Sequence, residues 1–292
     1  MGALLRTAGP PVLAVLTAFL VDHLCARRGL LPPGFRVSDS PGALSAAALR
    51  RATALLVVAG ALWLGVFAPL GSLGVESVFD PTGIKAPQLF LLHGLLLAAV
   101  GSWFLLGFGA GGSGTGPRHQ FGLRARRVDV ELGIGVVAGL VAWMAVITTM
   151  VLTGLGLWAL GGRDLLPESA PPLVPWLAGL PLLLRLGVSV SAGFAEEVFF
   201  RGFLQPRAGV LLSTVLFVLA HLSYEQPFML LGVALLSLIF GALVLWRQSV
   251  WAAISAHATF DAIQLTIMIP WALEHLDDGR LPLAATLLLT PH

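Results

Sequence analysis

The sequence predicts an all-α protein that crosses a membrane about eight times, since a bilayer core needs roughly 20 apolar residues per helix. Of the 292 residues, 57% are hydrophobic and only 11% are charged, whereas soluble domains carry about 25% charged residues. The mean hydropathy is +0.90. Apolar segments of membrane-spanning length recur along the chain, and Cys25, the single cysteine, excludes an intrachain disulfide. We therefore expect a polytopic membrane protein.

Seams rich in Pro, Gly and charged residues divide the apolar sequence into eight predicted helices. They lie near 4–25, 52–75, 88–109, 132–160, 176–204, 208–222, 228–246 and 250–270. The first lacks the cleavage site of a signal peptide and is interpreted as a transmembrane helix. We expect a single integral membrane domain in three parts. Residues 1–175 form the N-terminal helices, 176–270 the helices that carry three polar motifs, and 271–292 a short tail.

The loop charges predict the topology. The first, third, fifth and seventh loops are rich in Arg, and the others carry mainly Asp and Glu. By the positive-inside rule, the arginine-rich loops are cytoplasmic and both termini lie outside. The net charge of +2 says little about partners, and no nucleic-acid partner is expected. With one lysine and one tyrosine, the composition suggests a bacterial protein of the inner (cytoplasmic) membrane.

The segment 191–201 contains adjacent carboxylates, Glu196 and Glu197, followed by Arg201 in otherwise apolar sequence. Ionisable residues at membrane depth are costly and usually functional. On an α-helix Glu197 and Arg201 face each other at i, i+4, while Glu196 points about 100° away. A salt bridge at a helix end is the alternative interpretation of these three residues.

Two further polar sites follow on apolar segments. His221 ends one of them, and His257 and Asp261 share a helix face at i, i+4 on another. The depth of each ionisable group follows from its distance along the helix to the flanking arginine. At about 1.5 Å per residue, four groups lie roughly 15–21 Å from the cytoplasmic boundary: Glu196, His221, His257 and Asp261. They can therefore converge near the middle of the membrane. A lone intramembrane His or His–Asp pair is otherwise a packing or interhelical contact.

The three motifs together resemble those of the CPBP intramembrane proteases, which include the type II CAAX prenyl proteases and bacteriocin-processing or immunity (Abi) proteins. The motifs are Glu196-Glu197-x-x-x-Arg201, Phe217-x-x-x-His221 and His257-x-x-x-Asp261. The resemblance implies a metal-independent, glutamate-type endopeptidase. Glu196 and His221 would activate water, and His257 and the fourth residue would stabilise the oxyanion. Prenyl proteases typically have Asn at the fourth position, where this chain has Asp261.

The chemistry of Asp261 has two interpretations. A protonated Asp261 donates a hydrogen bond to the oxyanion, as Asn would. An ionised Asp261 instead accepts from one ring nitrogen of His257, so that the other nitrogen can donate. In either case Glu197 holds Arg201, and Arg201 and Phe217 are supporting residues.

No cofactor is expected, although two histidines and two carboxylates are an acceptable zinc set. The expected partners are the lipid bilayer and a membrane-embedded or lipid-anchored peptide or protein, cleaved near its C-terminus or leader. A non-catalytic scaffold or bacteriocin-immunity protein, or a proton-coupled transporter, remains an alternative. His93 is interpreted as a packing residue, and Arg185 as a residue that snorkels, marks a helix break or pairs with a carboxylate.

Overall fold

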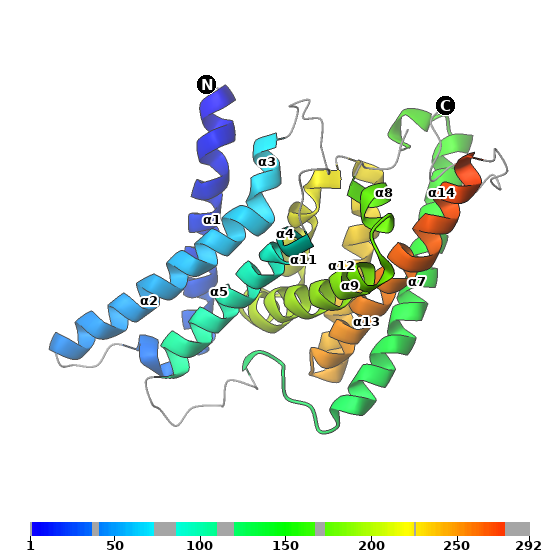
Figure 1. The fold of residues 1–292 in the computed structure, drawn as a ribbon. Helices are drawn as coiled ribbons and strands as arrows, with labels where there is room; N and C mark the ends of the chain where they lie inside the picture. Colours follow the sequence, from blue (N-terminus) through cyan, green and yellow to red (C-terminus); the bar gives the residue numbers. More distant parts are fainter. Residues whose placement is uncertain are drawn as a thin grey trace.

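The computed structural model describes residues 2–36, 41–72, 86–109, 120–166, 173–224 and 226–277, and every regular element within these ranges is helical (Figure 1). Six helices in them are long and apolar enough to cross a membrane. They are Arg6–Arg27, Ala46–Gly71, Leu91–Phe108, Val128–Ala159, Pro227–Arg247 and Trp251–His275. The all-α polytopic membrane fold is confirmed, while the count of eight spans stays a prediction.

The N-terminal helices start earlier or are more divided than predicted. α1 covers Gly2–Arg27. The second helix starts at Pro41 rather than near 52, and runs as α2 (Pro41–Leu62), the π-helical turn η2 (Trp63–Phe67) and α3 (Ala68–Ser72). Arg50 and Arg51 are helical, and their guanidinium groups bind Gly34 O and the carboxylate of Asp22. The short 3₁₀ helix η1 (Pro33–Phe35) lies between α1 and α2.

The third and fourth predicted helices are close to the structure. α4 (Ala86–Leu89) leads through a turn into α5 (Leu91–Phe108), and α7 covers Val128–Ala159. η4 (Arg163–Leu165) follows α7.

The predicted helix 176–204 is wrong as one element. α8 (Leu173–Ala178) ends at a break over Gly179-Leu180-Pro181, where proline cannot continue the hydrogen-bond ladder. The motif helix then runs from 182 to 208 as α9 (Leu182–Glu196), the π-helix η5 (Glu197–Leu204) and α10 (Gln205–Ala208). In Figure 1 the yellow-green α9 crosses the middle of the bundle at a steep angle to α1 and α7.

The remaining elements extend to residue 277. α11 (Val210–Ala220) and η6 (Leu222–Tyr224) form the short sixth helix, and α12 covers Pro227–Arg247. α13 (Trp251–Ile263) continues through the π-helical turn η7 (Gln264–Met268) into α14 (Ile269–Asp277). The predicted end of this helix at 270 is therefore too early, because residues 271–277 are helical. The rest of the predicted tail, 278–292, lies outside the described residues.

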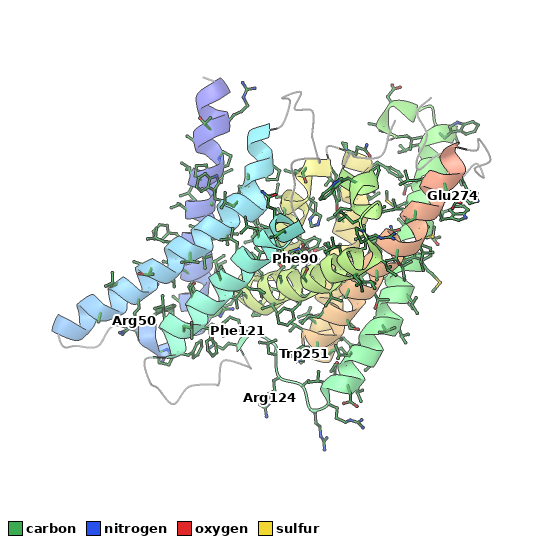
Figure 2. All side chains as sticks on the ribbon, in the orientation of Figure 1. Arg50, Phe90, Phe121, Arg124, Trp251 and Glu274 are labelled. Atoms are coloured by element: carbon green, nitrogen blue, oxygen red, sulfur yellow. The ribbon has the colours of Figure 1, made fainter. Side chains whose placement is uncertain are left out.

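The two ends of the described chain lie on one side of the bundle. The start of α1 and the end of α14 are both at the top of Figure 1. In Figure 2 Arg124 lies at the lower end and Glu274 near the upper end. This arrangement is the one expected if both termini are external, although the topology itself stays a prediction.

Close helix packing places α13, which carries the third motif. A Cβ on Gly135 of α7 would lie 2.3 Å from Ala252 O, and one on Gly139 would lie 2.6 Å from Ala256 O. On the other side, a Cβ on Gly193 of α9 would lie 2.8 Å from Ile254 O. Small residues allow backbones to approach this closely. α13 is therefore held between α7 and the motif helix.

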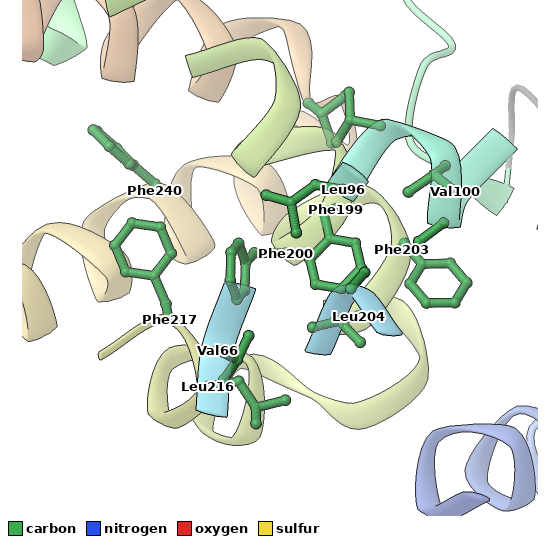
Figure 3. Close-up of a cluster of buried hydrophobic side chains, with 14 of the residues drawn as sticks. Val66, Leu96, Val100, Phe199, Phe200, Phe203, Leu204, Leu216, Phe217 and Phe240 are labelled. Atoms are coloured by element: carbon green, nitrogen blue, oxygen red, sulfur yellow. The ribbon is translucent and has the colours of Figure 1, made fainter. Parts of the chain in front are cut away.

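An aromatic cluster holds the π-helical part of the motif helix. Phe199, Phe200 and Phe203 are fully buried, and their rings contact one another at centroid distances of 5.2 and 5.9 Å. Figure 3 shows them beside residues from four other elements, among them Val66, Leu96, Leu216, Phe217 and Phe240. Burying one such side chain contributes about 1.5–3 kcal/mol. The motif residues therefore project from a rigid base.

Candidate active site

The first motif lies at the start of a π-helix. η5 begins at Glu197, and all eight of its residues through Leu204 are buried. π-Helical turns are uncommon and occur frequently at functional sites. Here the change of helical geometry falls between Glu196 and Glu197, the two adjacent carboxylates.

Glu197 and Arg201 form a buried ion pair, as their spacing predicts. Arg201 Nη1 lies 2.9 Å from Glu197 Oε1, and the side chains are 1% and 0% exposed. Nη1 makes no aligned hydrogen bond, so the contact is an ion pair only. Arg201 also lies over the ring of Phe217 at 4.3 Å, and its Nη2 donates a long 3.4 Å bond to Ser237 O. Phe217 thus supports the pair by a cation–π contact.

His257 lies between two carboxylates. Its Nδ1 is 2.9 Å from Glu197 Oε1, and its Nε2 is 3.4 Å from Asp261 Oδ2. Carboxylate oxygens accept hydrogen bonds, so with both acids ionised the ring carries a proton on each nitrogen. The contact to Glu197 is the shorter of the two. The sequence analysis paired Glu197 with Arg201 only.

Glu196 differs from Glu197 in its ion pairs. Glu197 Oε1 contacts Arg201 and His257, while Glu196 forms no ion pair with the described residues. The Oε2 atoms of both residues are buried without a hydrogen bond to the described residues. Buried polar groups in proteins are nearly always hydrogen-bonded, so such a group requires an explanation. A carboxylate oxygen without a protein partner remains able to accept from a water or a substrate.

His221 is fixed by the end of its own helix. It is the C-cap residue of α11, and its Nδ1 is 2.7 Å from Phe217 O. A carbonyl oxygen can only accept, so Nδ1 carries the proton. In the neutral ring Nε2 is then unprotonated and able to act as a base. The rings of Phe217 and Tyr224 pack against His221 at 4.6 and 5.6 Å.

Residues 178–263 match the family model for type II CAAX prenyl endopeptidase Rce1-like proteins. All three motifs fall inside this range. Over this segment the chain is similar to the CAAX proteases. No curated protein and no solved structure matches the chain. The matched family consists of endopeptidases, and six helices of this chain are long and apolar enough to cross a membrane. Together these findings support a membrane-associated substrate.

Two residues outside the CAAX-protease motifs also face the site. The ring of Tyr224 contacts that of His221, with 5.6 Å between the ring centroids. Nδ1 of His93 on α5, which the sequence analysis treated as a packing residue, lies 2.9 Å from Ser191 Oγ on the motif helix. The sequence held only a weak signal for each. Tyr224 is the single tyrosine, three residues after His221, and His93 is a buried polar residue in an apolar helix.

Arg185 connects the motif helix to the helix of the third motif. Its Nη1 donates to Leu265 O at 2.9 Å, within the π-helical turn η7, and its Nε is buried without a hydrogen bond to the described residues. Arg185 thus binds a backbone carbonyl of the neighbouring helix, an arrangement not among those considered from the sequence.

The described residues contain no group of three or more His, Cys, Asp or Glu side chains placed to hold a metal ion. Both nitrogens of His257 face carboxylates, so neither offers a lone pair to a metal. The metal-independent mechanism stays a prediction, and chelation tests it.

Proposed function

We propose that this protein is a glutamate-type endopeptidase that hydrolyses a peptide bond inside the membrane. Its substrate is a membrane-embedded or lipid-anchored peptide or protein, cleaved near its C-terminus or leader. The observation that carries the proposal is the different surroundings of two adjacent carboxylates. Oε1 of Glu197 contacts both Arg201 and His257, whereas Glu196 forms no ion pair with the described residues and its Oε2 is buried without a hydrogen bond to them.

In this mechanism Glu196 and His221 activate the attacking water. A carboxylate in a desolvated site is a stronger base than one in water. Together with the unprotonated Nε2 of His221 it polarises a water molecule, whose oxygen attacks the carbonyl carbon of the scissile bond. The proton taken up by Glu196 then passes to the leaving amine, so that the site returns to its starting state. The backbone bond from Nδ1 keeps His221 in the required tautomer.

The oxyanion that forms in this step needs a positive partner. His257 supplies it as an imidazolium, because Glu197 holds Nδ1 at 2.9 Å while Asp261 holds Nε2 only loosely at 3.4 Å. Nε2–H can therefore turn from Asp261 to the oxyanion. Donors of this kind contribute a few kcal/mol to the transition state. In this proposal Glu197 orients the His257 ring. The sequence analysis considered that role for Asp261.

Comparison of protein termini in the membrane fraction tests this function. Membranes are prepared from cells that express the wild type, Glu196→Gln or Glu131→Gln, and new N- and C-termini are identified by mass spectrometry. Glu131 is the matched control, because it also loses a helix carboxylate but pairs with Arg247 away from the site. New termini are expected with the wild type and Glu131→Gln, and not with Glu196→Gln.

The same experiment separates the alternatives. A non-catalytic scaffold would produce no new termini with any variant, whereas its binding partners would still co-purify with Glu196→Gln. A proton-coupled transporter would also leave termini unchanged, and Glu196→Gln would abolish pH-dependent uptake of its solute. Equal sets of new termini from the wild type and from Glu196→Gln would assign the cleavage to another residue.

A further inference from the structure

An open hollow of about 400 Å³ lies beside the start of α13. It is lined by residues of the segment before α7, of the start of α7 and of the start of α13, which are Leu123, Arg124, Ala125, Val128 and Trp251. Small-molecule sites in proteins measure about 300–1,000 Å³ and are mostly apolar, with a few polar groups that orient the ligand. The hollow has this character, because Arg124 is the one charged residue among the described residues that line it.

The hollow lies at the level where membrane-spanning helices begin and end. Two candidate spans, Val128–Ala159 and Trp251–His275, begin with residues of its lining, and α12 ends its own span at Arg247. Figure 2 places Arg124 and Trp251 in the lower part of the bundle. Tryptophan and arginine are typical of the boundary between the membrane and the cytoplasm. The hollow is therefore at the level of the lipid headgroups, on the side that the loop charges predict to be cytoplasmic.

The wall of the hollow is fixed to the motif region. Trp251 Nε1 donates to Leu123 O at 3.1 Å, which binds the segment before α7 to the start of α13. In the same segment the buried ring of Phe121 stacks on Phe203 of η5 at a centroid distance of 6.3 Å. A ligand would thus meet a preformed surface, which lowers the entropic cost of binding.

The positive charge around the hollow is only partly neutralised within the protein. Both carboxylates in the first turn of α7 are already paired with arginines, one of them with Arg127 and the other with Arg247. Arg124 and Arg126 are exposed and form no ion pair with the described residues. A bound anion would compensate this charge. Because the rest of the lining is apolar, an anionic amphiphile fits the hollow better than a soluble ion does.

We propose that this hollow binds the phosphate headgroup of an anionic phospholipid. Arg124 donates to the phosphate oxygens, as arginine does in paired hydrogen bonds, while Leu123, Val128 and the Trp251 ring contact the glycerol and the start of the acyl chains. Basic residues at the membrane surface attract anionic lipids. A bound lipid would hold the segment before α7 against α13 and so stabilise the fold. The inference does not depend on the proposed function, because the hollow contains none of the motif residues.

Native mass spectrometry of the delipidated protein in detergent tests the charge of the site. The probes are phosphatidylglycerol and phosphatidylcholine with identical acyl chains, and the wild type should bind phosphatidylglycerol more tightly. Arg124→Gln should weaken this binding by about fivefold, the size expected for one basic residue near an anionic lipid. Arg27→Gln is the matched control, because Arg27 is also an exposed arginine at the end of a candidate span but does not line the hollow. It should bind as the wild type does.

A second pair of variants tests the shape of the site while every arginine is kept. Val128→Trp fills the hollow and should weaken phosphatidylglycerol binding, whereas Val137→Trp lies outside the hollow on the same helix and should not. The two positions are 38% and 61% exposed, so both variants should fold, which thermal unfolding verifies. Phosphatidylglycerol should raise the thermal midpoint of the wild type by several degrees, and Arg124→Gln should lose most of this gain.

Three results would overturn the inference. Equal affinity of the wild type for the two lipids, or equal losses in Arg124→Gln and Arg27→Gln, would show attraction to the net charge of the protein rather than to this hollow. Unchanged binding by a folded Val128→Trp would exclude the hollow as the site. Displacement of the lipid by an equal concentration of inorganic phosphate would assign Arg124 to a soluble anion. None of these measurements uses activity, so an inactive protein with the expected lipid binding would retain the site and refute the protease function.

Discussion

The adjacent glutamates allow a sharp test of the buried ion pair, because the same isosteric change has opposite effects at the two positions. Glu197→Gln removes the negative charge from a side chain that is fully buried and contacts both Arg201 and His257. Removing one member of a buried pair costs about 3–5 kcal/mol, because the remaining charge is left uncompensated. The Phe217 ring beneath Arg201 lessens this by about 0.5–2 kcal/mol at most.

The expected effect is large enough to measure in detergent. For a chain of this size about 2 °C of thermal midpoint corresponds to 1 kcal/mol, so Glu197→Gln should lose roughly 6–10 °C. Its level in membranes should fall as well, since less stable proteins are degraded. Thermal unfolding followed by tryptophan fluorescence, together with immunoblots of membrane fractions, measures both quantities. Glu196→Gln is the matched control and should stay within about 0.5 kcal/mol of the wild type, because it breaks no ion pair within the described residues.

A double variant distinguishes the ion pair from a general packing defect. Replacement of a buried pair by apolar side chains of similar volume is often neutral. Glu197→Gln with Arg201→Met should therefore recover most of the stability that Glu197→Gln loses. If Glu197→Gln is as stable as Glu196→Gln, or if the double variant is less stable than the single one, the electrostatic account of this pair is wrong.

Three other predictions concern the topology, the metal dependence and Asp261. A reporter fused after Gly116 should be cytoplasmic and one at His292 external, and a cytoplasmic His292 would contradict both the topology and the depth argument. Prolonged treatment with a zinc chelator should leave cleavage intact, whereas loss of activity that zinc restores would assign histidines and a carboxylate to a metal. Asp261→Asn should keep most of the activity, because Glu197 still holds Nδ1 of His257, but the activity should be lost at a lower pH, because His257 loses one of the two carboxylates that favour its imidazolium form. A large loss of turnover in a stable Asp261→Asn would return the orienting role to Asp261.

Local spacing was enough to predict the contacts that lie within one helix. Glu197 and Arg201 meet because residues four apart share a helix face, and His257 and Asp261 meet for the same reason. The membrane character followed from composition and from the length of the apolar segments. The bilayer requires both, however the helices pack against one another. Gly135 and Gly139 have the four-residue spacing typical of close helix packing, and the structure places both against α13.

Contacts between distant helices were decided only by the tertiary structure. His257 and Glu197 are 60 residues apart, and His93 and Ser191 are 98 residues apart. No local periodicity encodes such a pairing, because it depends on how α5, α9 and α13 cross. The sequence therefore left open which nitrogen of His257 would be held, and by which carboxylate.

The backbone geometry of the motif helix was likewise decided by packing. The segment 197–204 reads as ordinary helix by composition, but the structure makes it π-helical and surrounds it with buried phenylalanines. Its extra residue per turn changes the directions of the side chains that follow Glu196. The sequence by itself determined which ionisable groups enter the membrane. The crossing of the helices decided that Glu197 also contacts His257 while Glu196 forms no ion pair with the described residues, because only another helix can supply this further partner in an apolar interior.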